Sequence, residues 1–96
     1  MVIVREGIAR FRFFRPSATR VFLSGDFNDW RTDQLLMSRS ADGYWEAKLR
    51  LPDGCYQFGY VADGQWYVDY ASFGVEAGPV GLRSLLRIAP DSRYVG

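Results

Sequence analysis

The sequence contains no histidine, a single cysteine (Cys55) and no apolar run long enough to cross a membrane. It therefore lacks the residues for imidazole acid–base catalysis, thiol–imidazole dyads, Cys/His metal sites and internal disulfides. The opening residues 1–7 do not have the architecture of a secretory signal, and an unpaired cysteine fits a reducing compartment. We expect a cytoplasmic protein with no catalytic residue, no metal, no cofactor and no membrane partner.

The chain also lacks an excess of charge of either sign. Its 12 Lys and Arg residues nearly balance 11 Asp and Glu residues, so the formal net charge is +1. This balance does not supply the positive field that drives nucleic-acid binding, and we expect no nucleic-acid partner. Four arginines would form a patch for phosphate or an acidic protein if the first and last strands were neighbours; otherwise they line a solvated sheet face. They are Arg10, Arg12, Arg83 and Arg87.

Helical periodicity is scarce, whereas alternation of apolar and polar residues recurs in short runs bounded by Gly, Pro, Asp and Asn. This pattern predicts an all-β antiparallel sandwich. With 96 residues, 48% of them hydrophobic, the chain builds one core, so we expect a single domain over residues 1–90 and a loose tail over 91–96. The seven predicted strands are residues 9–14, 20–24, 35–38, 44–51, 55–62, 65–69 and 82–88.

The strand over residues 44–51 shows the clearest alternation, with Trp45 on the same face as three small or aliphatic residues. We expect that face to be core. Two turns are predicted to close hairpins, one at residues 52–54 (Pro-Asp-Gly) and one at residues 63–64 (Asp-Gly).

The segments LSGDFNDW (residues 23–30) and LPDGCYQFGYVADGQW (residues 51–66) resemble the family 48 carbohydrate-binding modules. That family includes early-set domains of isoamylases and branching enzymes, and the glycogen-binding domain of the AMP-activated protein kinase β subunit. The similarity extends from about Gly7 to about Ile88. It implies an immunoglobulin-like early-set β-sandwich that binds α-1,4-linked glucans such as glycogen, starch or maltooligosaccharides.

The resemblance implies that two tryptophans hold the glucan, and these fall on Trp30 and Trp66. The apolar C–H face of a pyranose stacks on a flat indole, while its hydroxyls require polar partners at the edge. For both residues the alternative is a tryptophan that caps the rim of the core.

Two positions differ from the family pattern. A lysine that assists sugar binding in the kinase-type modules aligns with Gly59, which has no donor, and an asparagine aligns with Arg83, which only donates. We expect Gly59→Lys to tighten glucan binding, because glycine in a strand interior contributes no packing. Gln57 and Tyr67 are expected to flank the site and to supply replacement hydrogen bonds.

Three carboxylates in the loop after the second predicted strand invite a glycosidase interpretation: Asp26, Asp29 and Asp33. All three lie in one exposed loop without an apolar pocket, so we expect no catalysis. The functional alternative to glucan binding is a structural scaffold that contacts another protein, such as a glycogen-metabolising enzyme.

Overall fold

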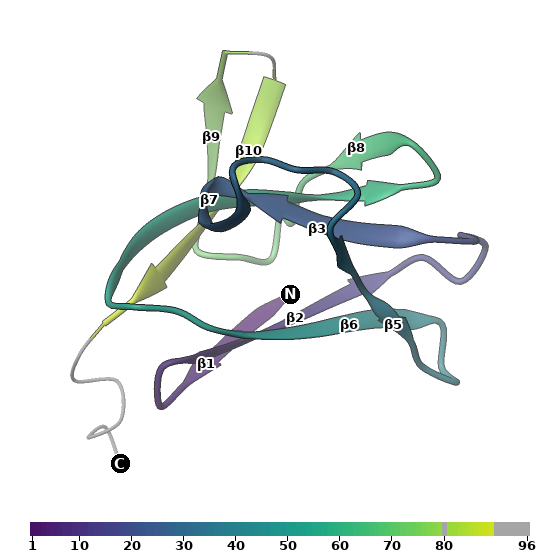
Figure 1. Cartoon of the computed structure of the whole chain (residues 1–96), viewed down its shortest axis with the longest axis horizontal. Helices are drawn as coiled ribbons and strands as arrows, with labels where there is room; N and C mark the ends of the chain where they lie inside the picture. Colours follow the sequence, from purple (N-terminus) through teal and green to yellow (C-terminus); the bar gives the residue numbers. More distant parts are fainter. Residues whose placement is uncertain (80, 90–96) are drawn as a thin grey trace.

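The computed structural model describes residues 1–79 and 81–89, and two antiparallel sheets pack face to face in it (Figure 1). The first sheet has the strand order β1-β2-β6-β5, and the second has the order β4-β3-β7-β10-β9, with β8 beside β7. This arrangement confirms the predicted all-β sandwich. The strands are β1 Val2–Arg5, β2 Ile8–Phe14, β3 Val21–Gly25, β4 Leu35–Leu36, β5 Ser38–Arg39, β6 Tyr44–Arg50, β7 Gly54–Ala62, β8 Gln65–Tyr67, β9 Val75–Gly78 and β10 Gly81–Ile88, and a short 3₁₀ turn, η1, covers Asp26–Asn28.

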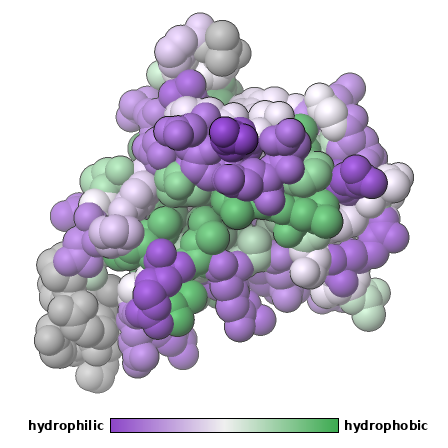
Figure 2. Space-filling view, viewed as in Figure 1, coloured by the Kyte–Doolittle hydropathy of each residue, from purple (hydrophilic) through white to green (hydrophobic). Residues whose placement is uncertain are grey.

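The core lies between the facing sheets and is dense in aromatic rings. Phe11 of β2 meets Phe58 of β7 edge to face, with ring centroids 5.1 Å apart, and Phe13 stacks on Tyr60 at 4.4 Å. Trp45 is 5% exposed, which confirms the predicted core face of β6. Figure 2 shows the same separation from outside, with hydrophobic residues gathered in the band between the sheets and hydrophilic residues covering the outer faces. Alternation thus leaves the other face of each strand to solvent.

The segment after η1 crosses from one sheet to the other. Leu35–Leu36 pairs with β3, whereas Ser38–Arg39 pairs with β6. Between them Met37 is 2% exposed, and its backbone N–H donates to the Val21 carbonyl at 2.8 Å. The single strand predicted over residues 35–38 is therefore two short strands that close one side of the sandwich.

The hairpin predicted at residues 52–54 is wrong, because β6 and β7 belong to different sheets. The turn residues there carry the chain across the core instead. The hairpin at Asp63 and Gly64 is confirmed, since β7 pairs with β8 and both turn residues have positive φ, 49° and 83°. The carboxylate of Asp63 also accepts backbone N–H groups of Thr19 and Arg20 at 3.0 to 3.1 Å, which anchors this turn.

Two strands were missed, β1 and β9, both of which end the strand order of their sheets. The condition for a four-arginine patch is not met, because β2 and β10 lie in different sheets. Arg12 pairs with Glu46 at 2.8 Å and with Asp42 at 3.3 Å. The tail expected over residues 91–96 lies outside the described residues.

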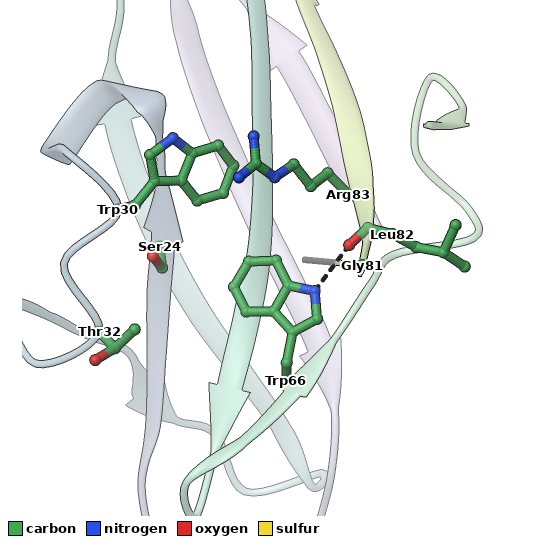
Figure 3. Close-up of a pocket in the computed structure, with 7 residues that line it drawn as sticks. All are labelled: Ser24, Trp30, Thr32, Trp66, Gly81, Leu82 and Arg83. Carbon is green, nitrogen blue, oxygen red and sulfur yellow. Dashed lines mark hydrogen bonds between the residues drawn. The ribbon is translucent and has the colours of Figure 1, made fainter. Parts of the chain in front are cut away.

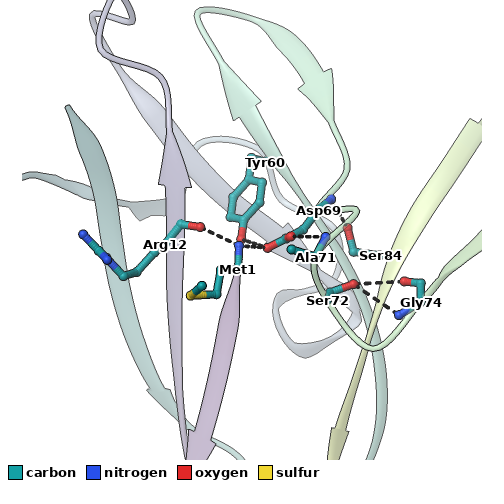
Figure 4. A network of polar contacts seen from close by, with 8 residues as sticks. All are labelled: Met1, Arg12, Tyr60, Asp69, Ala71, Ser72, Gly74 and Ser84. Carbon is teal, nitrogen blue, oxygen red and sulfur yellow. Dashed lines mark hydrogen bonds and ion pairs between the residues drawn. The ribbon is translucent and has the colours of Figure 1, made fainter. Parts of the chain in front are cut away.

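A buried polar cluster links the two sheets next to the core (Figure 4). The Asp69 carboxylate accepts hydrogen bonds from the Tyr60 hydroxyl at 2.8 Å, from the Ala71 N–H at 2.9 Å and from the Met1 amino group. The Ser84 hydroxyl accepts from the Asp69 backbone N–H at 2.7 Å. Burial, and secondly the charge of Asp69, raises the pKa of Tyr60 well above its ordinary value near 10.

Candidate functional site

A pocket of about 300 Å³ opens on the outer face of the second sheet (Figure 3). Its lining combines two large indoles with one guanidinium and small polar groups. The side chains come from β3, the loop after η1, β8 and the start of β10. The lining residues are Ser24, Trp30, Thr32, Trp66, Gly81, Leu82 and Arg83.

Trp30 reaches the pocket through an unusual backbone conformation. Asp29 and Trp30 both have positive φ, 57° and 58°, directly after η1. A left-handed conformation costs a non-glycine residue about 1–2 kcal/mol. Asn28 holds the turn, because its side chain accepts from the Gly25 N–H at 3.0 Å and donates to the Arg31 carbonyl at 3.2 Å. The loop therefore pays a conformational cost to place the Trp30 indole beside β3.

Trp66 lies across the outer face of β7, with 39% of its surface exposed. Its indole N–H donates to the Leu82 carbonyl at 2.8 Å, which joins β8 to β10 over the intervening strand. Directly beneath the ring is Gly59, where an added Cβ would lie 2.2 Å from the nearest ring atom of Trp66. Trp66 thus packs directly on Gly59, so the assumption behind Gly59→Lys, that this glycine contributes no packing, is wrong.

The two indoles form an angled pair, with centroids 6.1 Å apart and planes inclined at 52°. The guanidinium of Arg83 lies over the Trp30 ring, 4.0 Å from its centroid. Gln57 fixes that guanidinium, because its side-chain carbonyl accepts from Arg83 at 3.0 Å. The amide N–H of Gln57 in turn donates to Glu76 at 2.9 Å. A relay across β9, β7 and β10 therefore orients the one guanidinium that lines the pocket.

Ser24 brings a buried hydroxyl to this pocket. It is 0% exposed, and within the described part of the chain its Oγ has no hydrogen-bond partner. A buried hydroxyl without a partner costs free energy. The accessible groups of the pocket are flat apolar rings and guanidinium donors, a combination suited to a polyhydroxylated ligand with an apolar face.

The structure brings together four of the five residues predicted for the site: Trp30, Trp66, Gln57 and Arg83. Tyr67 is separated from them because adjacent residues of β8 point to opposite faces. Its ring packs against Phe13 with centroids 5.6 Å apart, and its hydroxyl accepts from Arg15 at 2.7 Å.

Sequence reasoning missed Ser24, Thr32, Leu82 and Glu76. Ser24 lies in the predicted second strand, but its polar side chain alone does not indicate a pocket. Glu76 lies in β9, which was missed, so only the pairing of Arg83 with Glu76 reveals their proximity.

The carboxylates considered for catalysis are all exposed. Asp26 accepts the Gln57 backbone N–H at 3.1 Å, which ties η1 to β7, while Asp29 and Asp33 lie on the loop surface. Among the described residues, no group of three or more Cys, Asp or Glu side chains is placed to hold a metal ion. No helix in residues 1–79 or 81–89 has the length and apolarity needed to span a membrane.

Comparison with known proteins gives a family match over residues 9–77, to the glycogen recognition site of AMP-activated protein kinase. The 1,4-alpha-glucan branching enzyme GlgB of Lactobacillus acidophilus is 33% identical over 93 residues, covering 92% of this chain and 14% of that enzyme. PTST homolog 2 of Arabidopsis thaliana is 40% identical over 53 residues, 55% of this chain and 10% of that protein. The human 5'-AMP-activated protein kinase subunit beta-2 is 43% identical over 49 residues, 51% of this chain and 17% of the subunit. The chain thus spans a small part of each relative.

Proposed function

Since the chain belongs to the family of the glycogen recognition site of AMP-activated protein kinase, we propose that it binds α-1,4-linked glucans in the Trp30 and Trp66 pocket. The family is one of non-catalytic carbohydrate-binding modules. Glycogen, starch and maltooligosaccharides are the ligands proposed for this chain.

The observation that carries the site assignment is the angled pair of indoles, 6.1 Å apart and inclined at 52°. An α-1,4-linked glucan curves, so successive glucose rings present their C–H faces at different angles. Two inclined indoles fit such a chain better than one flat platform does, because stacking requires parallel faces. The positive φ of Trp30 supports the same assignment, since strained backbone tends to persist where function needs the side chain.

Arg83 is proposed as the polar partner of the bound sugar. Its guanidinium donates to Gln57 and lies over Trp30, so its remaining N–H groups are available at the edge of the indole. These donors suit the oxygen atoms of sugar hydroxyls, and they take the place of the amide found at this position in the family. Gln57 orients the guanidinium and does not itself contact the sugar.

Calorimetric titration with maltoheptaose tests the proposal, with cellohexaose as the control for linkage. The wild-type chain is expected to bind maltoheptaose and not the β-linked oligosaccharide. Trp66→Ala should lower the affinity by roughly thirtyfold, equivalent to about 2 kcal/mol for a central stacking residue. Trp30→Ala should act similarly.

Tyr70→Ala is the matched control, because it removes an aromatic ring that is 77% exposed and does not line the pocket. Its affinity should equal that of the wild type. If the wild type fails to bind maltoheptaose or glycogen at millimolar concentration, the proposal fails and the scaffold alternative takes its place. If binding survives both tryptophan substitutions, the glucan binds elsewhere on the sandwich.

A further inference from the structure

A second hollow, of about 380 Å³, lies on the outer face of the first sheet, which faces away from the indole pocket. Three neighbouring strands form it, β1, β2 and β6. One cross-strand row places Ile3 opposite Arg10 and Arg10 opposite Lys48. The next row places Arg5 opposite Ile8 and Ile8 opposite Arg50. The residues that line the hollow are Ile3, Arg5, Glu6, Ile8, Arg10 and Lys48.

This face holds four cations without carboxylate partners in the described part of the chain: Arg5, Arg10, Lys48 and Arg50. All four are exposed. Arg10 and Lys48 stand directly opposite each other, and like charges in that position destabilise a sheet. Arg12, one row away, is by contrast paired with Glu46 and Asp42. The four cations therefore do not contribute ion pairs to the fold, although the chain has nearly equal numbers of acids and bases.

Aliphatic surface lies among these charges. Ile3 is 45% exposed and Ile8 is partly exposed within the same hollow. Apolar area of this kind is stabilised by burial against apolar side chains of a partner. This face also has three carboxylates on it or beside it: Glu6, Asp42 and Glu46. Their negative charges repel a uniformly negative surface, such as a phosphate backbone or an anionic membrane.

We propose that the hollow of β1, β2 and β6 docks a protein segment that carries acidic and aliphatic side chains. Acidic residues of the segment pair with Arg5, Arg10 and Lys48, while its aliphatic residues cover Ile3 and Ile8. The mixed charges of the face favour a protein, whose carboxylates are discrete, over a polyanion.

The test uses a soluble synthetic peptide of glutamate and leucine, monitored by backbone amide shifts in ¹H–¹⁵N spectra of the folded chain. Amide signals from β1, β2 and β6 should shift, while the indole N–H signals of Trp30 and Trp66 should not. The double variant Arg10→Gln/Lys48→Gln should weaken binding about fivefold or more, and raised salt should weaken it further. The double variant Arg20→Gln/Arg87→Gln, which removes two exposed cations elsewhere, is the matched control and should bind as the wild type does.

Stability separates this proposal from a structural role for the cations. Arg10→Gln/Lys48→Gln should leave the urea midpoint unchanged or raised, because it removes like-charge repulsion; a clear fall would overturn the proposal. Tighter binding to polyphosphate or to phosphatidylserine vesicles than to the peptide would also overturn it, as would self-association of the free chain through this face. Maltoheptaose binding by the same variant should be unchanged, so the docking proposal and the glucan-binding proposal are tested independently.

Discussion

Among single residues, Gly59 sets the position of a binding group without contacting a ligand through a side chain of its own. Any larger residue there meets the Trp66 ring, because β7 passes directly beneath the indole. From the sequence alone, Gly59 was interpreted only as the loss of a hydrogen-bond donor. Alignment with the family identifies which residue type occupies the position but not the van der Waals space above it, which depends on how the neighbouring side chain folds over the strand.

Gly59→Ala should therefore weaken glucan binding by roughly tenfold, because the added methyl group displaces the Trp66 ring from its position against β7. Because Trp66 is 39% exposed and can move outward, the free energy of unfolding should change by no more than about 1 kcal/mol. Titration with maltoheptaose and urea denaturation check the two effects. Unchanged or tighter binding would show that the packing of Trp66 on Gly59 is unimportant for glucan affinity.

Trp45 gives the opposite case, a tryptophan with a purely structural role. Trp45→Ala should lower the free energy of unfolding by roughly 3–5 kcal/mol, because it empties a buried site and removes the hydrogen bond from its indole to the Arg15 carbonyl. Trp66→Ala is the matched control, the same truncation at a partly exposed position, and should cost less than half as much. Equal urea midpoints for the two variants would contradict the assignment of roles.

Among the elements, η1 and the residues after it place Trp30. The turn depends on Asn28, whose side chain bonds to the backbone on both sides of the loop. The sequence motif placed Trp30 in a loop, but the left-handed conformations of Asp29 and Trp30 are not evident from residue type, since neither position is glycine.

Asn28→Ala should loosen this loop at a cost of about 1 kcal/mol, the usual value for a lost side-chain cap. Glucan affinity should fall together with it, because Trp30 is then no longer held beside β3. Titration and thermal unfolding of the variant measure the two effects, and Asn28→Asp, which keeps an acceptor for the Gly25 N–H, should recover most of the affinity. Normal glucan binding by Asn28→Ala would show that the turn does not position Trp30.

Other elements show which sequence signals are reliable. The Asp63 and Gly64 turn was predicted correctly because its residues favour positive φ, a local property. The Pro-Asp-Gly turn at 52–54 was misassigned because turn residues indicate a change of direction, not which strands pair. Strand β1 escaped detection because its exposed Ile3 interrupts the alternation. Strand β9 escaped detection because its four residues, which follow Gly74 and end at Gly78, have little apolar pattern.

In the whole molecule, the sequence predicted the sandwich, the core face of β6 and both tryptophans of the proposed site. It did not predict which side chains surround those tryptophans. Arg83 and Glu76 meet because β10 pairs with β9, and Arg83 meets Gln57 because β10 also lies beside β7. Such proximities depend on long-range pairing, so residue patterns within one strand do not reveal them.

The buried cluster around Asp69 links the two sheets and makes the stability of the fold sensitive to pH in the alkaline range. Above about pH 10 the unfolded chain loses the Tyr60 proton while the folded chain retains it, so the unfolded state binds fewer protons and stability falls as pH rises. Urea midpoints measured from about pH 8 to about pH 11 should show this decline, and Tyr60→Phe should show a smaller one. An equal decline in both proteins would mean that Tyr60 ionises freely when folded.

The most direct test of the glucan site uses the three tryptophans of the chain, Trp30, Trp45 and Trp66, as internal reporters. Each contributes one indole N–H signal to a ¹H–¹⁵N spectrum, assigned through single Trp→Phe variants, and maltoheptaose is then titrated into the wild type. We expect the signals of Trp30 and Trp66 to shift together along one saturable curve, while that of the buried Trp45 remains in place. Saturable binding that leaves the Trp30 and Trp66 signals unmoved would contradict this expectation.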